Sequence, residues 1–296
     1  MKPKTLRRRK ATEFMFVGLF ILSIVLALGT LAVLLLTVVL SAIPYFRPEV
    51  LYNYAGTTDP YEAGYAAAIV STLWIVGLTL LFSLPLGIAA GIYLEEYAPR
   101  SRVSRILQAG VGNLAGVPSV VFGLLGLALF VRLLYPITQG ATVLSGALTL
   151  TILVFPYVVV TTQEAVRAVP ASLREGSLAL GATQWQTVQR QVVPAAAPGL
   201  LTATILAASR AIGETAPLIV IGMFFFQAFL PSGPLDPASP LPVQIYGYIG
   251  LPADPTLPSG GFPGVAAAGI VILLTILFGI NAVAIIVRNR LQRQRW

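Results

Sequence analysis

The sequence predicts an all-α polytopic membrane protein with six transmembrane helices. Of its 296 residues, 56% are apolar and only 10% are charged, whereas a soluble domain carries about 25% charged residues. The mean hydropathy is +0.84. Six apolar runs each exceed the ~20 residues that cross the hydrocarbon core. They lie at 14–43, 66–94, 111–134, 141–163, 199–226 and 264–287.

The first run follows a basic stretch and therefore resembles a signal peptide. Its apolar part is about twice the length of an ordinary signal core, so we expect an uncleaved anchor. The predicted organisation is a basic N-terminus (1–13), a first span with its outer loop (14–65), a five-span core (66–290) and a short tail (291–296).

The positions of the basic residues predict the orientation of the chain. Sixteen of the 19 lie in the two terminal segments and in the loops 95–110 and 164–198. By the positive-inside rule these parts, with both termini, face the cytoplasm. The net charge of +8 is then explained without nucleic acid. The outer loops are 44–65, 135–140 and 227–263, and the last is rich in Pro and Gly, which favours turns over a domain.

The missing residue types exclude several kinds of site. The chain has no cysteine and no histidine, so thiolate or imidazole metal sites and Ser-His nucleophiles are absent. Lysine occurs only at Lys2, Lys4 and Lys10, and no Gly-Lys-Ser/Thr phosphate loop is present. We expect no catalytic residue, metal or cofactor on this chain, and no ATP hydrolysis by that loop. A membrane-embedded enzyme is disfavoured for the same reasons.

The loop 164–198 contains the start and stop signals of two short helices. Ser172 and Glu175 have capping-box spacing, the first helix would run to Leu180, and Gly181 suits a left-handed cap. Thr183 and Gln186 repeat the box, and Pro194 and Pro198 would end the second helix before span five. Such a helix-turn-helix, with Trp185 among its apolar residues, is either a docking element for a cytoplasmic partner or an interfacial amphipathic helix.

The same loop resembles the cytoplasmic signature of binding-protein-dependent ABC importer permeases. That signature is Glu-Ala-Ala, three residues, Gly, nine residues, Ile, any residue and Leu-Pro. The Glu, Gly and Pro match in type and spacing, whereas the alanines, the Ile and the Leu are replaced. The matches are Glu175, Gly181 and Pro194, and the replacements are Gly176, Ser177, Gln191 and Val193.

Three further segments narrow the resemblance to phosphate permeases of the type I, MetI-like fold. LAGVPSVVFGL (114–124) is similar to their third span, and LALGATQWQ (178–186) and SRAIGETAPL (209–218) are similar to the PstA subunits in particular. The similarity covers about residues 66–290. Another oxyanion permease, or the PstC-like partner subunit, remains an alternative.

The resemblance implies a transport complex in the bacterial inner membrane. A PstA-like and a PstC-like subunit form the pathway, and an extracytoplasmic phosphate-binding protein delivers the substrate. Two ATPase subunits, which carry ATP and Mg, dock on residues 170–194 and drive alternating access. We call residues 165–198 the coupling segment. Its implied ATPase contacts are Ser172, Arg174, Glu175, Gly181, Ala182, Thr183 and Trp185.

Two charges lie inside span five. Counted from Gly199 at 1.5 Å per residue, Arg210 is about 16 Å and Glu214 about 22 Å into the membrane, where charge is costly. Four residues apart, they share a helix face and can pair. Either the pair only fixes packing, or Arg210 presents its donors to a passing phosphate while Glu214 holds it. Pro217 favours a bend beside them.

Thr215 and Ser119 complete the predicted substrate pathway. Thr215 lies within the PstA-like block, and Ser119 lies in the third-span segment with Gly116 and Pro118. For Gly116, Pro118 and Ser119 the alternative is a role in helix packing or kinking.

Overall fold

The computed structural model describes residues 3–99 and 101–293. Within these ranges the secondary structure is helical apart from one isolated bridge between Thr142 and Pro237. Lys2, Arg100 and Arg295, which support the predicted orientation, lie outside the described residues, as do residues 294–296 of the predicted tail.

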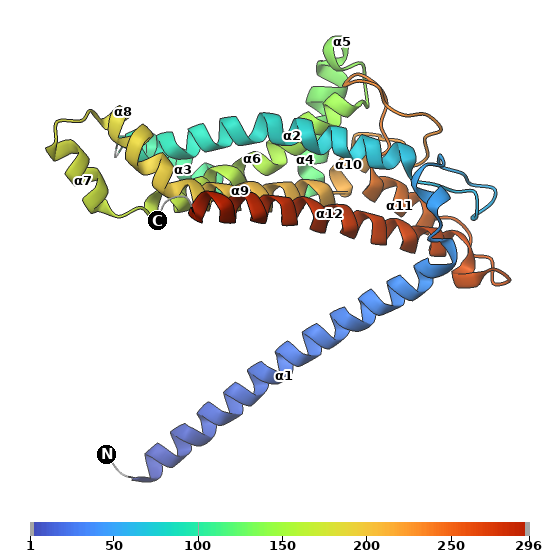
Figure 1. Cartoon of the computed structure of the whole chain (residues 1–296), viewed down its shortest axis with the longest axis horizontal. Coiled ribbons are helices and arrows are strands. Elements are labelled where there is room, and N and C mark those ends of the chain that lie inside the picture. The colour runs from blue at the N-terminus through green and yellow to red at the C-terminus, as the bar shows by residue number, and fades with distance from the viewer. Residues whose placement is uncertain (1–2, 100, 294–296) are drawn as a thin grey trace.

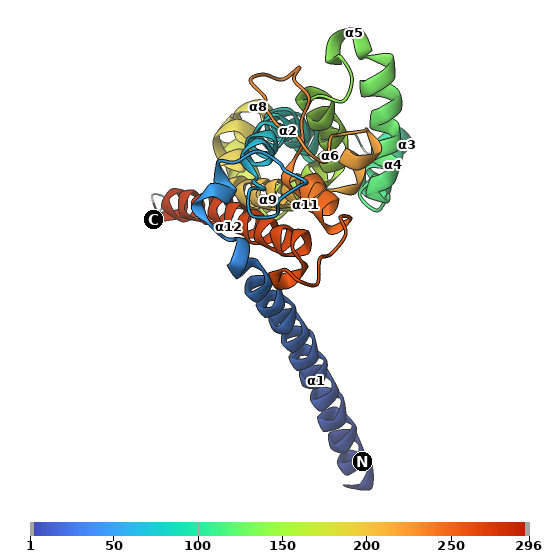
Figure 2. The ribbon, with the colours of Figure 1, turned by 90° about the vertical axis from the view of Figure 1, so that its right-hand side faces the viewer.

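The predicted fold class is confirmed. Five helical runs are long and apolar enough to cross a membrane, and one bent pair of helices makes a sixth. The main helices of the five runs are α1 (Pro3–Ala42), α2 (Ala66–Ile92), α6 (Val143–Arg167), α9 (Val193–Gly213) and α12 (Phe262–Arg293). Four of them, α2, α6, α9 and α12, lie side by side as a bundle (Figure 1; Figure 2).

The most extensive contact in the bundle joins α2 to α6, and the two backbones approach each other closely there. A Cβ atom at Gly87 would lie 2.7 Å from Val158 Cγ1, and one at Gly91 would lie 2.6 Å from Thr162 Cβ. Gly87 and Gly91 are one turn apart on α2, so they form a strip on which the facing turn of α6 rests. Small residues permit this approach of backbones in membranes, where dispersion replaces the hydrophobic effect.

Helix α1 stands apart from the bundle and meets it only at its outer end (Figure 1). The side chains from 13 to 37 are exposed, whereas Ala42 and Tyr45 are buried. The anchor includes the 3₁₀ turn η1 (Ile43–Tyr45), where the Tyr45 hydroxyl donates to the Pro258 carbonyl oxygen at 2.7 Å. A second 3₁₀ turn, η2 (Pro48–Leu51), follows.

The third predicted span is broken. Residues 111–114 belong to α3 (Arg102–Leu114), which turns by 103° into α4 (Ser119–Gly126) and its π-helical extension η4 (Leu127–Leu133). Pro118 precedes α4 with ψ 137°, which is not a helical angle. A proline also disfavours helix at the residue before it. The short α5 (Tyr135–Thr138) ends this arm, which projects sideways from the bundle (Figure 2).

The fifth predicted span also ends early. α9 stops at Gly213, and Glu214 takes extended backbone angles before α10 (Ala216–Val220). The expected continuous helix to residue 226 is therefore wrong, because Pro217 lacks the N–H that would bond to the Gly213 carbonyl. Beside the charges we expected a bend, and the structure has a complete interruption of the helix there.

The outer loop 227–263 is more ordered than its composition indicates. It contains α11 (Leu241–Ile249) and the 3₁₀ turn η6 (Pro258–Gly260). Gln244 and Tyr248 of α11 are fully buried, and Leu241 N–H donates to Thr72 Oγ1 of α2 at 2.8 Å. Pro242 lies in the first turn of this helix, where proline is tolerated because its missing N–H would have no partner within the helix.

Replacement of Gly91 by Ala is expected to destabilise the bundle by about 1–3 kcal/mol, because the added methyl group overlaps Thr162 and the Val159 carbonyl. The measurement is the midpoint of thermal unfolding of the purified chain in detergent. Gly77→Ala is the matched control on the same helix, since a Cβ atom there would meet nothing within 4 Å. Equal midpoints for the two variants would contradict the packing role.

Candidate functional site

The coupling segment forms the predicted helix-turn-helix at one end of the bundle (Figure 1). α7 (Ala171–Ala179) is followed by Gly181 at φ 85° and by α8 (Gln184–Thr187). The Ala182 N–H donates to the Ser177 carbonyl oxygen, and the Gly181 N–H donates to that of Leu178. These two bonds make a Schellman turn, which requires the left-handed residue that glycine supplies.

Of the two predicted capping boxes, only the second exists. Thr183 caps α8, and the Gln186 side chain accepts from the Thr183 N–H at 2.9 Å. The box at Ser172 and Glu175 is wrong, because Pro170 takes the N-cap position of α7.

The predicted end of the second helix at Pro194 is also wrong. A π-helical turn, η5 (Val188–Val192), joins α8 to α9, so one helical run extends from Gln184 to Gly213. Pro194 is the second residue of α9 and directly follows the π-helical turn, so it lies inside the run and does not end it. Pro198 lies inside α9 and does not end it.

The outer surface of the coupling segment is apolar and hollowed. Leu180 at the turn is 90% exposed, and Leu173, Leu178 and Trp185 are also exposed. A groove of about 550 Å³ lies between the two limbs. Ser172, Gly181 and Ala182 line it, whereas Glu175 is exposed beside it. Exposed apolar patches of this kind mark sites of protein contact.

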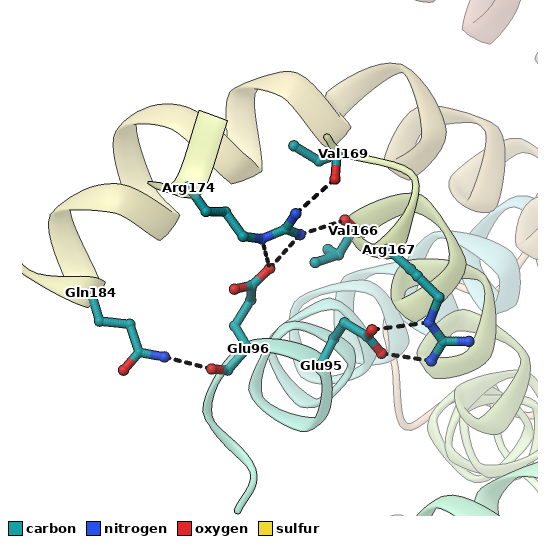
Figure 3. A network of polar contacts seen from close by, with 7 residues as sticks. All are labelled: Glu95, Glu96, Val166, Arg167, Val169, Arg174 and Gln184. Carbon is teal, nitrogen blue, oxygen red and sulfur yellow. Dashed lines mark hydrogen bonds and ion pairs between the residues drawn. The ribbon is translucent and has the colours of Figure 1, made fainter. Parts of the chain in front are cut away.

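Arg174 differs from the other predicted coupling residues because it points inward (Figure 3). Its Nε and Nη2 donate to Glu96 Oε1 at 3.0 and 2.7 Å. Nη1 donates to the Val169 carbonyl oxygen at 2.7 Å, and Nη2 to that of Val166 at 2.8 Å. We call these four residues the Arg174 node. A cation here also satisfies carbonyl groups at the C-terminal end of α6.

The carboxylates at the end of α2 are functional candidates that the sequence reasoning missed. They lie in η3 (Tyr93–Tyr97), a π-helical continuation of α2. Glu95 binds Arg167 of α6 through two bonds at 3.0 and 2.8 Å. The Glu96 carbonyl oxygen accepts from Gln184 Nε2 of α8. In the sequence, these residues could have been recognised as two adjacent acids at the end of an apolar run.

Arg210 and Glu214 pair as predicted, although Glu214 follows the helix and does not share it. Arg210 Nε lies 3.4 Å from Glu214 Oε1, and its guanidinium carbon lies 5.9 Å from the centre of the Tyr157 ring on α6. Such a distance permits a cation–π contact. Within residues 3–99 and 101–293, Arg210 Nη1 and Nη2 have no hydrogen-bond partner. Both side chains are partly buried.

Two hydrogen bonds fix how deep Arg210 lies. Ser209 Oγ donates to Asn281 Oδ1 at 2.9 Å, and Arg288 Nη1 donates to Thr202 Oγ1 at 3.3 Å. α9 and α12 therefore run antiparallel in step, which places Arg210 level with Ile280. That level is about 10 Å from the C-terminal end of the apolar run 264–287. By this register Arg210 lies beside the apolar run of α12, nearer to the C-terminal end of that run than the sequence-based depth predicts.

The remaining pathway candidates lie on two short helices that touch. Ser119 starts α4, and Thr215 precedes α10. A Cβ atom at Gly123 of α4 would lie 2.8 Å from Pro217 Cα of α10. Ser119 is four residues before Gly123, so it lies on the face of α4 that packs on α10. Both Ser119 and Thr215 are half-buried.

No group of three acidic, histidine or cysteine side chains that is able to hold a metal occurs in the described part of the chain.

The sequence profile of the family described as "Binding-protein-dependent transport system inner membrane component" matches residues 83–293. The chain belongs to this family. The matched range begins within α2 and includes the coupling segment, the Arg210–Glu214 pair and the broken third span.

Several curated relatives of this permease are named for phosphate. The phosphate transport system permease protein PstA of Haemophilus influenzae is 33% identical over 82% of this chain and 84% of its own length. The probable PstA of Methanocaldococcus jannaschii is 32% identical over 86% of each chain. A relative from Bacillus subtilis, the probable ABC transporter permease protein YqgI, is 32% identical over 71% of this chain and 70% of its own length.

Solved ABC transporters share the fold of this permease. A chain of a bacterial alginate transporter has a TM-score of 0.66 at 15% identity, covering 94% of each chain. A chain of the MetNI methionine transporter, in an inward-facing conformation, has a TM-score of 0.62 at 20% identity, covering 76% of this chain and 95% of that one. Similarity at this identity establishes the fold alone.

Replacement of Gly181 by Ala is expected to loosen the coupling segment, because a left-handed residue with a Cβ atom costs about 1–2 kcal/mol. The measurement is amide hydrogen exchange of peptides covering residues 171–187, which should become faster. Gly176→Ala is the control in the middle of α7, where a Cβ atom meets nothing within 4 Å. Equal amide exchange rates in the Gly181→Ala and Gly176→Ala variants would contradict the proposed role of the turn.

Proposed function

We propose that this chain is a permease subunit of an ATP-driven phosphate importer and forms half of the translocation pathway. The observation that carries the proposal is its similarity to PstA proteins over more than four-fifths of the chain. The shared fold alone does not select a substrate, because the two solved neighbours are named for methionine and for alginate. The alternatives, a permease for another oxyanion or a PstC-like subunit, lack a comparable named relative among those described above.

The remaining subunits of the proposed importer follow from the same assignment. A PstC-like subunit completes the pathway, and a phosphate-binding protein docks on the outer face. Two ATPase subunits, carrying ATP and Mg, dock on residues 170–194. The exposed apolar residues and the groove of the coupling segment supply a surface for them. This placement puts both termini in the cytoplasm, in agreement with the distribution of basic residues.

Arg210 is the proposed phosphate contact within the membrane. Its Nη1 and Nη2 are free to donate, and a guanidinium fork matches the geometry of phosphate oxygens. Glu214 and the Tyr157 ring hold the side chain from two sides. Glu214 also offsets the charge of Arg210, so phosphate is bound weakly enough to leave, as conduction requires. Thr215 and Ser119 are the proposed neutral residues of the same pathway.

The substrate is tested by uptake of radiolabelled phosphate into vesicles that contain the complete importer. We expect ATP-dependent uptake that excess arsenate suppresses and the same excess of sulfate leaves intact, since arsenate shares the charge and protonation of phosphate. Equal suppression by sulfate and arsenate would defeat the phosphate assignment.

Arg210→Ala is expected to lower phosphate uptake by about 100-fold or more, because two charge-assisted hydrogen bonds to phosphate are lost. Glu214→Gln should reduce uptake less, because the amide still positions Arg210. Copurification of the subunits shows that each variant assembles. Normal uptake by an assembled Arg210→Ala complex would exclude Arg210 from the pathway and leave the pair a packing role.

A further inference from the structure

The coupling segment is joined to the bundle helices in two different ways. α8 and α9 belong to one helical run, and α7 follows α6 after three residues, 168–170. A movement of the segment therefore reaches α9 and α6 through the chain itself. α2 has no such covalent connection, because α3 to α6 separate it from the segment in sequence.

Apart from the Glu95–Arg167 pair at the end of α6, the polar contacts between the end of α2 and the coupling segment in the described residues meet at Glu96. Its carboxylate binds Arg174 of α7 and its carbonyl oxygen binds Gln184 of α8, so it holds both limbs (Figure 3). The limbs are also tied to each other, because the hydroxyl groups of Ser177 and Thr187 lie 2.9 Å apart. Glu96 thus contacts a segment that is able to move as one body.

Side-chain packing joins α2 to the coupling segment on one side, where Ile88 and Ile92 pack against a cluster that includes Val166, Val169 and Val192. The side toward α8 is not packed in this way. Between the end of α2 and α8 lies an apolar groove of about 330 Å³. Tyr93 and Tyr97 line it from the α2 side, and Trp185 and Val188 from the other side. An open groove forfeits the dispersion contacts that a filled one has, so a push from α8 meets little resistance there.

The two adjacent acids of η3 are in different surroundings. The Glu96 side chain is 10% exposed and its partner Arg174 is 23% exposed. Glu95 is 18% exposed, but its partner Arg167 is 66% exposed. Exposed ion pairs contribute little, whereas removal of one partner of a buried pair leaves an uncompensated charge. Glu95 moreover binds α6, against which α2 already packs closely through Gly87 and Gly91.

We propose that Glu96 and Arg174 are positioning residues that make α2 follow the coupling segment when the ATPases move it. The proposal rests on the proposed function, since it assigns a route for the force that drives that transport. Arg174 is suited to this role because it also holds the Val166 and Val169 carbonyls. Through these hydrogen bonds the Arg174 side chain holds the adjacent ends of α2 and α6, so the two ends move together.

The experiment uses the complete importer in vesicles and measures phosphate uptake and ATP hydrolysis in the same sample. Glu96→Ala is expected to lower the phosphate taken up per ATP by at least about five-fold, the lower end of usual coupling between sites. ATP hydrolysis itself should persist, because the docking surface is intact. Glu96→Gln should fall in between, since the amide oxygen still accepts from Arg174.

Glu95→Ala is the matched control, an adjacent acid with an equally short bond to arginine, and should leave the ratio unchanged. A proportional loss of uptake and hydrolysis in Glu96→Ala, an unchanged ratio, or an equal loss in Glu95→Ala would each overturn the proposal. If the alanine variant does not assemble, Glu96→Gln, which keeps the shape of the side chain, decides by the same ratio.

A second readout needs no transported phosphate. The chain has no cysteine, so Leu81→Cys on α2 and Leu206→Cys on α9, both at exposed positions, provide sites for spin labels. ATP should shift the distance between the labels in the otherwise unchanged chain, and Glu96→Ala should abolish the shift. A shift that persists in Glu96→Ala, or one that never occurs, rejects the proposal. Vesicles that show the shift without phosphate uptake reject the proposed function instead.

Discussion

The close packing of α2 on α6 is the contact on which the rest of the bundle depends. Gly87 and Gly91 bring the two backbones together, and the coupling segment lies at one end of this pair of helices. α6 also carries Tyr157, which lies against the guanidinium of Arg210. The same helix therefore borders both the Arg174 node and the charged pair within the membrane.

Two of the three arginine–glutamate pairs of the described residues show how surroundings assign different tasks to the same chemistry. In the Arg174 node, four hydrogen bonds engage all three guanidinium nitrogen atoms and leave one of the five N–H groups unused. Arg210 has one long contact to Glu214 and keeps two nitrogen atoms free in the described structure. An arginine whose nitrogen atoms are all hydrogen-bonded holds elements of the structure together. An arginine in a membrane span that keeps unbonded donors is available to an anion.

Composition and periodicity predicted the spans well because a bilayer demands long apolar runs whatever their contacts. They failed where single residues end or redirect a helix. Pro118 and Pro217 accompany breaks, yet Pro194 and Pro198 lie in a continuous run, so proline alone does not distinguish them. The difference comes from π-helical turns and tertiary packing, which leave no periodic trace. Arg174 was found by its place in a motif, but its inward direction depends on Glu96, 78 residues earlier.

The isolation of α1 has a consequence for biogenesis. Its side chains from 13 to 37 touch no other part of the described chain closely enough to be buried, so its insertion does not wait for the later spans. A helix this apolar is stable in lipid by itself, and the basic residues before it set its direction. The first span is therefore able to insert before any contact of the bundle exists.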